Sequence, residues 1–437
     1  MKHSPNSPIL LTPSLHVDEA RKAIANLVAE LLQEANVAQD PQEIETVSLD
    51  KAINRILAAD LLSPIDVPAA DNSAMDGYAF DGACLSVGSP EISLRIVGTA
   101  LAGKPYEGSI GKDECLKIMT GALMPQGCDT VIPQEFTSEQ DGTIRFKQDQ
   151  LKVGENRRLR GEDLKQGKAA ISAGRLLRPS DLGLVASLGI STLPVRRKLK
   201  VAILSSGDEL RALNQTLDAG SVYDSNRYSL TGLLNRLDLE IIDCGIVRDD
   251  PTSLRKAFIE ASEKADVLIS SGGVSVGEAD FTKQIMQELG DVGFWKIAMR
   301  PGRPMAFGVL KAAPGNPSAR KTLFFGLPGN PVAVMVTFYQ FVRSALLQLN
   351  GAKQTEPPLI QAISETAIRK KPGRTEFQRA ILGRGSDGKP TLRLTGSQGA
   401  GILRSMSEAN CFVILAHEQG NIAAGDWVDI ALFEGLL

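Results

Sequence analysis

The stretch "DVLISSGGVSVGEADFTKQIMQEL", residues 266–289, contains the pattern that decides the fold. Its apolar run at 267–269 is typical of a buried strand, and the segment "FTKQIMQEL" at its end is typical of a helix. Directly after the strand, the two serines and two glycines at 270–273 allow backbone N–H groups to close on an anion. Glu278 and Asp280, just before the helix, carry carboxylates that suit a hard cation. The stretch predicts a strand, a phosphate-binding loop and a helix.

The loop alone leaves two interpretations open. It matches neither the G-x-G-x-x-G dinucleotide pattern nor the G-x-x-x-x-G-K-[ST] phosphate loop, and glycines at strand ends also form ordinary turns. Two neighbouring loops favour a binding site. The segment "SSGDEL" (205–210) follows another strand with Asp208 and Glu209, and "YDSN" (223–226) precedes another helix. We expect these loops to converge, because the carboxyl ends of parallel strands share one edge of a sheet.

Strands and helices alternate regularly from residue 198 to about residue 351. Asp250 and Pro251 supply an N-cap and a first-turn proline for the helix that follows, and a long helix is expected from 331 to 349. This order predicts a mostly parallel sheet that is covered on both faces by helices. Ligands are expected at the carboxyl ends of its strands.

The segments before residue 198 and after residue 351 show a different pattern of expected helices and strands. An amphipathic helix is expected over 17–32, and a β-rich module over about 52–150, where Asp141 and Gly142 indicate a turn between two strands. Short strands return from residue 359 to the end, with turn signals at 387–388 and 425–426. We therefore expect a small β-barrel-like domain at the C-terminal end.

Composition narrows the function classes. The 437 residues carry a net charge of −3, which argues against a nucleic-acid-binding protein that works by bulk electrostatics. No uninterrupted apolar run approaches the roughly 20 residues of a membrane span, and the N-terminal segment is too weakly apolar for a secretory signal. The five cysteines are scattered and only three histidines are present, so a zinc site or a disulfide scaffold is not expected. We expect a soluble, cytoplasmic protein with no membrane and no nucleic-acid partner.

Two further segments are candidate anion sites. "KIAMRPGRPMAFG" (296–308) presents Lys296, Arg300 and Arg303 around a Pro-Gly bend, and guanidinium groups bind oxyanions bidentately. "FGLPGNPVAV" (325–334) places Gly329 and Asn330 directly before a helix N-terminus. A solvated turn explains the first segment, and a simple helix start explains the second, so both interpretations stay open.

Seven motifs, in this order, resemble the MoeA-type molybdopterin molybdenumtransferases, which are related to the E domain of gephyrin. They are "DNSAMDGYA", "IMTGA", "RGED", "SSGDEL", "SSGGVSVGEAD", "RPGRP" and "LPGNPV". The resemblance covers roughly residues 20–437. The motif "DNSAMDGYA" favours this family over adenylyltransferases and nucleotide-pocket hydrolases, which share only the sheet domain.

The resemblance implies a multidomain α/β plus β fold. It predicts a discontinuous helical and extended linking domain (15–51 and 152–196), a β-rich inserted domain (52–151), a MoaB/Mog-like three-layer α/β domain that binds molybdopterin (197–352), and a C-terminal β-barrel domain (356–437). It also implies a homodimer whose active-site cleft is shared between one subunit's sheet domain and the partner's β-rich domain.

The implied activity is that of a transferase in molybdenum cofactor biosynthesis. The substrates would be adenylylated molybdopterin and molybdate, and Mg²⁺ would assist cleavage of the adenylate with release of AMP. The implied partners are the molybdopterin adenylyltransferase and apo-molybdoenzymes, both in transient contacts. A tungstate-inserting paralogue and a gephyrin-like scaffold that binds without turnover are the alternatives.

The resemblance also assigns residues around the phosphates. Asp249 and Asp280 would hold the metal, and Asp249 and Glu209 would be catalytic. Lys296, also catalytic, would contact the phosphates that link the nucleotide. Ser271, Gly272, Gly273 and Ser275 would cradle phosphate, and Asn226 would also bind the cofactor.

The remaining assignments concern the pterin and the oxyanion. Asp76 and Thr120, contributed by the other subunit of the dimer, would face the pterin side, with Asp163 in the same cleft, and Asp76 and Asp163 would be catalytic. The floor and the oxyanion site would be formed by Pro328, Asn330, Pro331, Arg300, Arg303 and Arg379. Many family members have lysines in "KPGKP" and serines where this chain has Ala333 and Ala400, so two hydroxyl donors of the expected molybdate site are missing.

Overall fold

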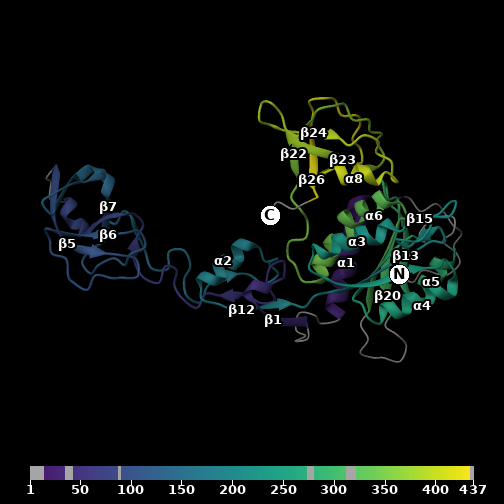
Figure 1. Cartoon of the computed structure of the whole chain (residues 1–437), viewed down its shortest axis with the longest axis horizontal. Helices are drawn as coiled ribbons and strands as arrows, with labels where there is room; N and C mark the ends of the chain where they lie inside the picture. The colour runs from purple at the N-terminus through teal and green to yellow at the C-terminus, as the bar shows by residue number, and fades with distance from the viewer. Residues whose placement is uncertain (1–13, 35–42, 87–89, 273–279, 312–320, 434–437) are drawn as a thin grey trace. The chain divides into compact units, whose positions relative to one another are not determined.

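The computed structural model describes residues 14–34, 43–86, 90–272, 280–311 and 321–433. The chain divides into two compact units (Figure 1). Unit 1 consists of Met1–Ala58, Gly174–Leu182 and Thr192–Leu437, and unit 2 consists of Ala59–Ala173 and Gly183–Ser191.

A six-stranded sheet forms the centre of unit 1. Its order is β16-β13-β17-β21-β20-β18. The first four strands run parallel to one another, and β20 pairs antiparallel with both of its neighbours, β21 and β18. The strands are β13 (Lys200–Ser206), β16 (Glu240–Val247), β17 (Val267–Ser271), β18 (Gly290–Lys296), β20 (Pro304–Leu310) and β21 (Thr322–Leu327). The predicted mostly parallel sheet is confirmed.

Alternating side chains of the strands supply two separate cores. In β13, Val201 and Ile203 belong to one core, while Ala202 and Leu204 belong to the other. The first core packs against α1 (Val17–Glu34), α3 (Ser225–Asn235) and the helical stretch Pro331–Leu349. The second packs against α4 (Pro251–Ser262) and α5 (Asp280–Leu289). The predicted three-layer arrangement follows from this alternation, because both faces of the sheet are apolar.

Local sequence signals explain how two of these helices form. The Asp250 carboxylate accepts hydrogen bonds from the backbone N–H groups of Thr252 (3.1 Å) and Ser253 (2.9 Å), and Pro251 occupies the first turn of α4. The helical stretch Pro331–Leu349 consists of α6 (Pro331–Thr337), a π-helical turn (Phe338–Val342) and α7 (Arg343–Leu349). It is long and apolar enough to cross a membrane, but 67% of it is buried inside the protein, as in a core helix.

A closed five-stranded barrel forms the C-terminal part of unit 1. The strands are β22 (Ile360–Ser364), β23 (Thr375–Arg384), β24 (Pro390–Leu394), β25 (Cys411–Leu415) and β26 (Trp427–Leu432), and the β23–β25 pairing closes the circle. Apolar side chains such as Ala380, Leu392 and Ile430 fill its interior. The short strand β19 (Met299–Arg300) pairs with β23 and α8 (Leu403–Glu408) packs beside it, so the barrel is joined to the arginine-containing bend.

Smaller elements complete unit 1. An antiparallel pair joins β1 (Ile44–Ser48) to β12 (Thr192–Arg196), and a short parallel pair joins β14 (Leu210–Arg211) to β15 (Val222–Tyr223). A 3₁₀ turn follows β1 at Leu49–Lys51. The helix α2 (Pro179–Ser187) begins in the unit 1 segment Gly174–Leu182 and ends in the unit 2 segment Gly183–Ser191.

Unit 2 contains the β-rich module. Its six-stranded sheet has the order β7-β4-β6-β5-β9-β8 and consists of β4 (Gly77–Phe80), β5 (Glu91–Ala100), β6 (Glu114–Ile118), β7 (Thr130–Pro133), β8 (Ser138–Gln140) and β9 (Thr143–Lys147). The β8–β9 hairpin turns at Asp141 (φ 51°) and Gly142 (φ 74°), the positive angles of a tight hairpin turn, as predicted. Unit 2 also contains two short antiparallel pairs, β2 (Leu61–Leu62) with β11 (Ala169–Ile171) and β3 (Asn72–Ser73) with β10 (Arg157–Arg158). Three 3₁₀ turns occur at Gly82–Ser86, Gln134–Phe136 and Gln148–Gln150.

We predict opposite effects for two Gly-to-Ala substitutions in unit 1. Gly272 has φ 92°, and a Cβ there would lie 2.3 Å from the carbonyl oxygen of Ser206, so Gly272→Ala should destabilise unit 1 by about 2 kcal/mol or more. Gly232 lies within α3 with open space around it, so Gly232→Ala should stabilise by about 0.5–1 kcal/mol. Urea unfolding of the two variants checks this, and equal midpoints would contradict it.

Candidate active site

The carboxyl ends of three parallel strands meet at one edge of the central sheet. β13 ends at Ser206, β17 at Ser271 and β21 at Leu327. The Gly272 N–H donates to the carbonyl of Leu327 at 3.1 Å, and the close approach to the Ser206 carbonyl leaves no room for a side chain at position 272. Glycine is therefore required here by the neighbouring backbone itself.

Asn226 joins three segments at this edge. It is 8% exposed, and α3 begins directly before it with Asp224 as N-cap. Its Nδ2 donates to the Ser271 Oγ at 2.8 Å and to the Gly329 carbonyl at 2.7 Å. The loops after β17 and β21 are therefore held together through one amide group.

Acidic side chains follow the ends of β13 and β16. The backbone N–H of Asp249 donates to Oδ1 of Asp208 at 3.4 Å, so these two loops are adjacent. Glu209 is exposed in the same loop as Asp208. Among the described residues, no group of three or more His, Cys, Asp or Glu side chains could hold a metal ion. The predicted loops are thus brought together at this edge.

A pocket of about 280 Å³ lies beside this edge, and we call it the oxyanion pocket. It is lined by the bend at 300–304, the loop 328–330, Ala333 from α6, and Gln398 and Ala400 from the barrel. The barrel loop is fixed there because the Val332 N–H donates to the Ala400 carbonyl at 3.1 Å. The sequence predicted that Arg300, Arg303, Pro328 and Asn330 belong to one site, and the pocket contains all four.

Arg379 lies behind this pocket, and it is not among the pocket-lining residues. Its side chain is 0% exposed, and it donates to Ser405 Oγ (3.0 Å) and to the carbonyls of Gln398 (3.2 Å), Ser397 (3.3 Å) and Gly399 (3.0 Å). Burial, together with the charge of Arg300, lowers the pKa of Arg379 to about 10. Arg379 therefore supports the barrel loop of the pocket, a role that its sequence context did not reveal.

Lys296 and Pro331 occupy the ends of secondary-structure elements. Lys296 is the exposed last residue of β18 and pairs in register with Pro304, so it neighbours the arginine-containing bend. Pro331 is the first residue of α6, where its missing N–H costs nothing.

In unit 2, Asp76 and Thr120 form a tight pair. Asp76 Oδ1 accepts from both the backbone N–H and the Oγ1 hydroxyl of Thr120, each at 2.7 Å. These two hydrogen bonds, the backbone one first, hold the pKa of the Asp76 carboxyl below its usual range. Asp163 is exposed, in a turn where its N–H donates to the Val67 carbonyl at 3.1 Å. Asp76 is therefore an ionised, exposed carboxylate at neutral pH.

Known proteins match almost the whole chain. Three family profiles match in succession: the MoeA N-terminal region (domain I and II) over residues 15–189, the "Probable molybdopterin binding domain" over 202–348, and the MoeA C-terminal region (domain IV) over 361–433. A molybdopterin molybdenumtransferase of Haemophilus influenzae is 43% identical over 399 residues, covering 91% of this chain and 96% of the relative. One of Nostoc sp. is 33% identical, covering 97% and 96%.

The chain belongs to the MoeA family of molybdopterin molybdenumtransferases. Its fold agrees with that assignment, because the crystal structure of the molybdopterin biosynthesis MoeA protein from Pyrococcus horikoshii OT3 superimposes with a TM-score of 0.76 at 25% identity. That match covers 96% of this chain and all of the other. The family is one of transferases, as the sequence predicted.

Some predicted site residues of this MoeA family member lie outside the part of the chain that the structure describes. Gly273, Ser275 and Glu278 lie outside the described residues. Asp280 begins α5, but its side chain also lies outside the description. Conversely, sequence reasoning missed Gln398, although it stands in the "QGA" segment whose alanine was noted.

The five cysteines of this MoeA family member are free. Burial raises the pKa of every one of these thiols, to about 12 for Cys115 and about 11 for Cys411. They are therefore poor nucleophiles at neutral pH.

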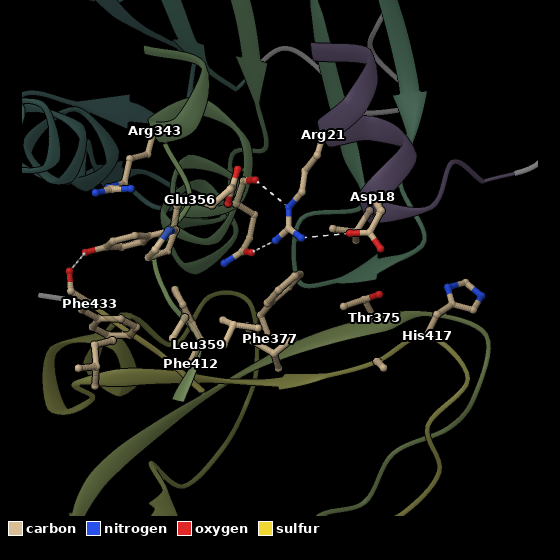
Figure 2. A pocket seen from close by; sticks show the side chains of 18 of the residues that line it. Asp18, Arg21, Arg343, Glu356, Leu359, Thr375, Phe377, Phe412, His417 and Phe433 are labelled. Carbon is tan, nitrogen blue, oxygen red and sulfur yellow. Dashed lines mark hydrogen bonds and ion pairs between the residues drawn. The ribbon is translucent and has the colours of Figure 1, made fainter. Parts of the chain in front are cut away.

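A second hollow, of about 370 Å³, shares no residue with the oxyanion pocket (Figure 2). Phe377, Phe412 and Phe433 form an apolar side, and Arg21 and Arg343 extend from α1 and α7 on the other. Arg21 is tied to Gln340 Oε1 at 2.5 Å and to Asp18 at 3.1 Å. None of the predicted site residues lines this hollow.

We predict that Thr120→Val raises the pKa of Asp76. Valine removes the hydroxyl donor but leaves the backbone N–H, so the pKa should move towards its usual value without reaching it. Because the folded pKa is lowered, the contact's stabilisation is complete above the ordinary aspartate pKa and is lost as the pH falls through the folded one. NMR titration of the Asp76 carboxyl carbon measures the shift. Thr137→Val, whose hydroxyl bonds Gln134 instead, should leave Asp76 unchanged.

Proposed function

We propose that this chain inserts molybdenum into molybdopterin, with adenylylated molybdopterin and molybdate as substrates and AMP as a product. The observation that carries the proposal is that the loop 328–330 belongs to two sites at once. Its Gly329 carbonyl is bonded to Asn226 at the strand edge, and Pro328, Gly329 and Asn330 line the oxyanion pocket. A phosphate held at the edge and an oxyanion in the pocket would thus lie on opposite sides of one short loop.

Different residues would bind the phosphates and the oxyanion. The Ser271 hydroxyl at the strand edge suits the phosphates that join AMP to the pterin. Arg300 and Arg303 suit a tetrahedral dianion, because each guanidinium presents several donors in one plane. Lys296, next in register to the bend, adds positive charge where the anhydride breaks. Such a site acts by positioning and charge stabilisation and needs no covalent nucleophile.

The carboxylates near the strand edge fit the way in which proteins usually coordinate Mg²⁺. Mg²⁺ is commonly bound by one or two carboxylates, several waters and substrate phosphates, so the lack of a three-carboxylate group among the described residues is no obstacle. Asp249 would hold it, and Asp280 at the start of α5 is the second proposed ligand, with Asp208 adjacent to Asp249. When bound, the ion would neutralise charge on the anhydride oxygens.

We propose further that the active enzyme is a cytoplasmic homodimer with composite sites. Asp76, Thr120 and Asp163 belong to unit 2 and the phosphate and oxyanion residues to unit 1, and the unit 2 residues would serve the pterin side of the partner's site. The ionised Asp76 would accept hydrogen bonds from pterin N–H groups. Transient contacts with the adenylyltransferase that supplies the substrate and with apo-molybdoenzymes complete the proposal.

Tungstate is the second candidate substrate. It is favoured by Ala333 and Ala400, which line the oxyanion pocket without hydroxyl donors, so the anion is held mainly by guanidinium groups. A scaffold that binds without turnover is the third candidate, and the intact set of Asp76, Asp249 and Lys296 argues against it.

We predict that the purified dimer with Mg²⁺ releases AMP from adenylylated molybdopterin only when molybdate is present. Release that is independent of molybdate, or no release, would contradict the proposal.

Asp76→Asn and Asp249→Asn should each abolish release. When the two variants are unfolded together and reassembled, about one quarter of wild-type activity should return, because half of the dimers then contain one intact composite site. No recovery in proven mixed dimers would place each site within one chain.

We predict that Ala400→Ser lowers the KM for molybdate by about 5-fold or more, because a hydroxyl that donates to a charged oxyanion strengthens its binding. Steady-state AMP release measures the change, and competition by tungstate measures which anion gains. Ala424→Ser, at an exposed barrel position, serves as the control. An unchanged KM for both anions would show that position 400 does not face the bound anion.

A further inference from the structure

We propose that Asn226 is a positioning residue that directs the Ser271 hydroxyl proton into the phosphate seat and keeps the Gly329 carbonyl away from the anions. Here the phosphate seat means the strand edge formed by Ser206, Ser271 and Gly272. The inference rests on the proposed function, because it assumes that phosphate binds at this edge. It differs from a direct binding role, since Asn226 acts through its two neighbours.

The orientation of the Asn226 amide is fixed by its surroundings. Nδ2 lies 2.7 Å from the Gly329 carbonyl oxygen, which can only accept a hydrogen bond. A rotated amide would place two acceptor oxygens at that distance, which is repulsive. The amide nitrogen must therefore face Gly329, and the same nitrogen lies 2.8 Å from the Ser271 Oγ.

This orientation decides what the Ser271 hydroxyl can do. Because Asn226 donates to the Ser271 oxygen, the hydroxyl proton must point elsewhere. Ser271 is 2% exposed, and within the described part of the chain its hydroxyl donates to no acceptor. A buried hydroxyl proton without an acceptor is costly, and it becomes favourable when an anion arrives. Ser271 is thus set as a donor for phosphate.

The second hydrogen bond acts on the loop that separates the two anion sites. An unpaired carbonyl oxygen beside phosphate or an oxyanion repels them both, and Asn226 occupies the Gly329 oxygen. The loop 328–330 can therefore form one wall of the oxyanion pocket and still face the phosphate seat. One amide group thus orients a donor at the phosphate seat and pairs a carbonyl oxygen in the wall of the oxyanion pocket.

The remaining Asn226 atom indicates that the residue does more than hold the fold. Its Oδ1 is buried and, among the described residues, has no hydrogen-bond partner. Native proteins rarely leave a buried amide oxygen unpaired, and exceptions concentrate where a ligand or a water completes the contact. A ligand hydroxyl or a bound water would supply the missing donor.

A double-mutant cycle tests the proposal with Asn226→Ala, Ser271→Ala and the double variant in the full-length protein. The probes are inorganic pyrophosphate and AMP, each titrated by calorimetry with Mg²⁺ present. Each single substitution should weaken pyrophosphate binding about 10-fold, as expected for loss of a hydrogen bond to a charged group. The double variant should lose clearly less than the roughly 100-fold that two independent effects would give, because part of the effect of Asn226 passes through Ser271 and only the part that passes through Gly329 remains. A loss of about 100-fold in the double variant would overturn the inference.

Two further variants keep the test decisive. Asn226→Asp preserves the shape of the side chain, but its carboxylate accepts the Ser271 proton and repels both Gly329 and phosphate. It should therefore bind pyrophosphate more weakly than Asn226→Ala, and equal or tighter binding would overturn the inference. Asn235→Ala, on the exposed end of α3, should leave binding unchanged and controls for effects on the helix.

The failure of this inference can be distinguished from failure of the proposed function. If the wild-type protein binds neither probe, the phosphate seat and the proposed function both fail. If the wild-type protein binds and the substitutions are additive, only the role of Asn226 fails. Thermal unfolding of each variant separates binding from stability: a lower Tm with unchanged affinity would show a purely structural role and overturn the inference.

Discussion

The parallel pairing of β13, β17 and β21 is the constraint on which the site depends. Parallel strands end at the same edge, so residues about 60 positions apart along the chain are brought together there. The pairing also fixes how close the backbones approach, and the contact between Gly272 and the Ser206 carbonyl leaves room only for glycine. With the edge defined, a single amide, that of Asn226, is enough to hold two of the loops.

Patterns that depend on neighbouring residues were predicted well from sequence. Asp250 and Pro251 encode the start of α4 through local hydrogen bonding, and Asp141 and Gly142 encode a hairpin turn through their tolerance of positive φ. The mostly parallel sheet followed from alternating strands and helices, and the barrel from closely spaced turn signals. In each case the physical cause acts over a few residues, so the sequence contains the whole signal.

Features that depend on distant contacts were not predictable in the same way. Arg379 looked like a third guanidinium for an anion, but its burial against carbonyls of the loop 397–399 is visible only in the folded barrel. The π-helical turn at Phe338–Val342 interrupts a pattern that reads as one regular helix. The shared loop between the phosphate seat and the oxyanion pocket likewise requires the pairing of β21 with β17 and the docking of the barrel.

The burial of Arg379 has a consequence for how the barrel and the sheet domain are coupled. Among the described residues, its guanidinium donates to the Ser405 hydroxyl and to backbone carbonyls and to no carboxylate, and its positive charge is opposed by that of Arg300, which lines the oxyanion pocket. Two like charges repel each other here, and an anion bound in the pocket, as proposed, would relieve that repulsion. By thermodynamic linkage, a ligand that binds only the docked arrangement must stabilise it. Under the proposed function, the cohesion of unit 1 would therefore depend on the concentration of the anion that this pocket binds.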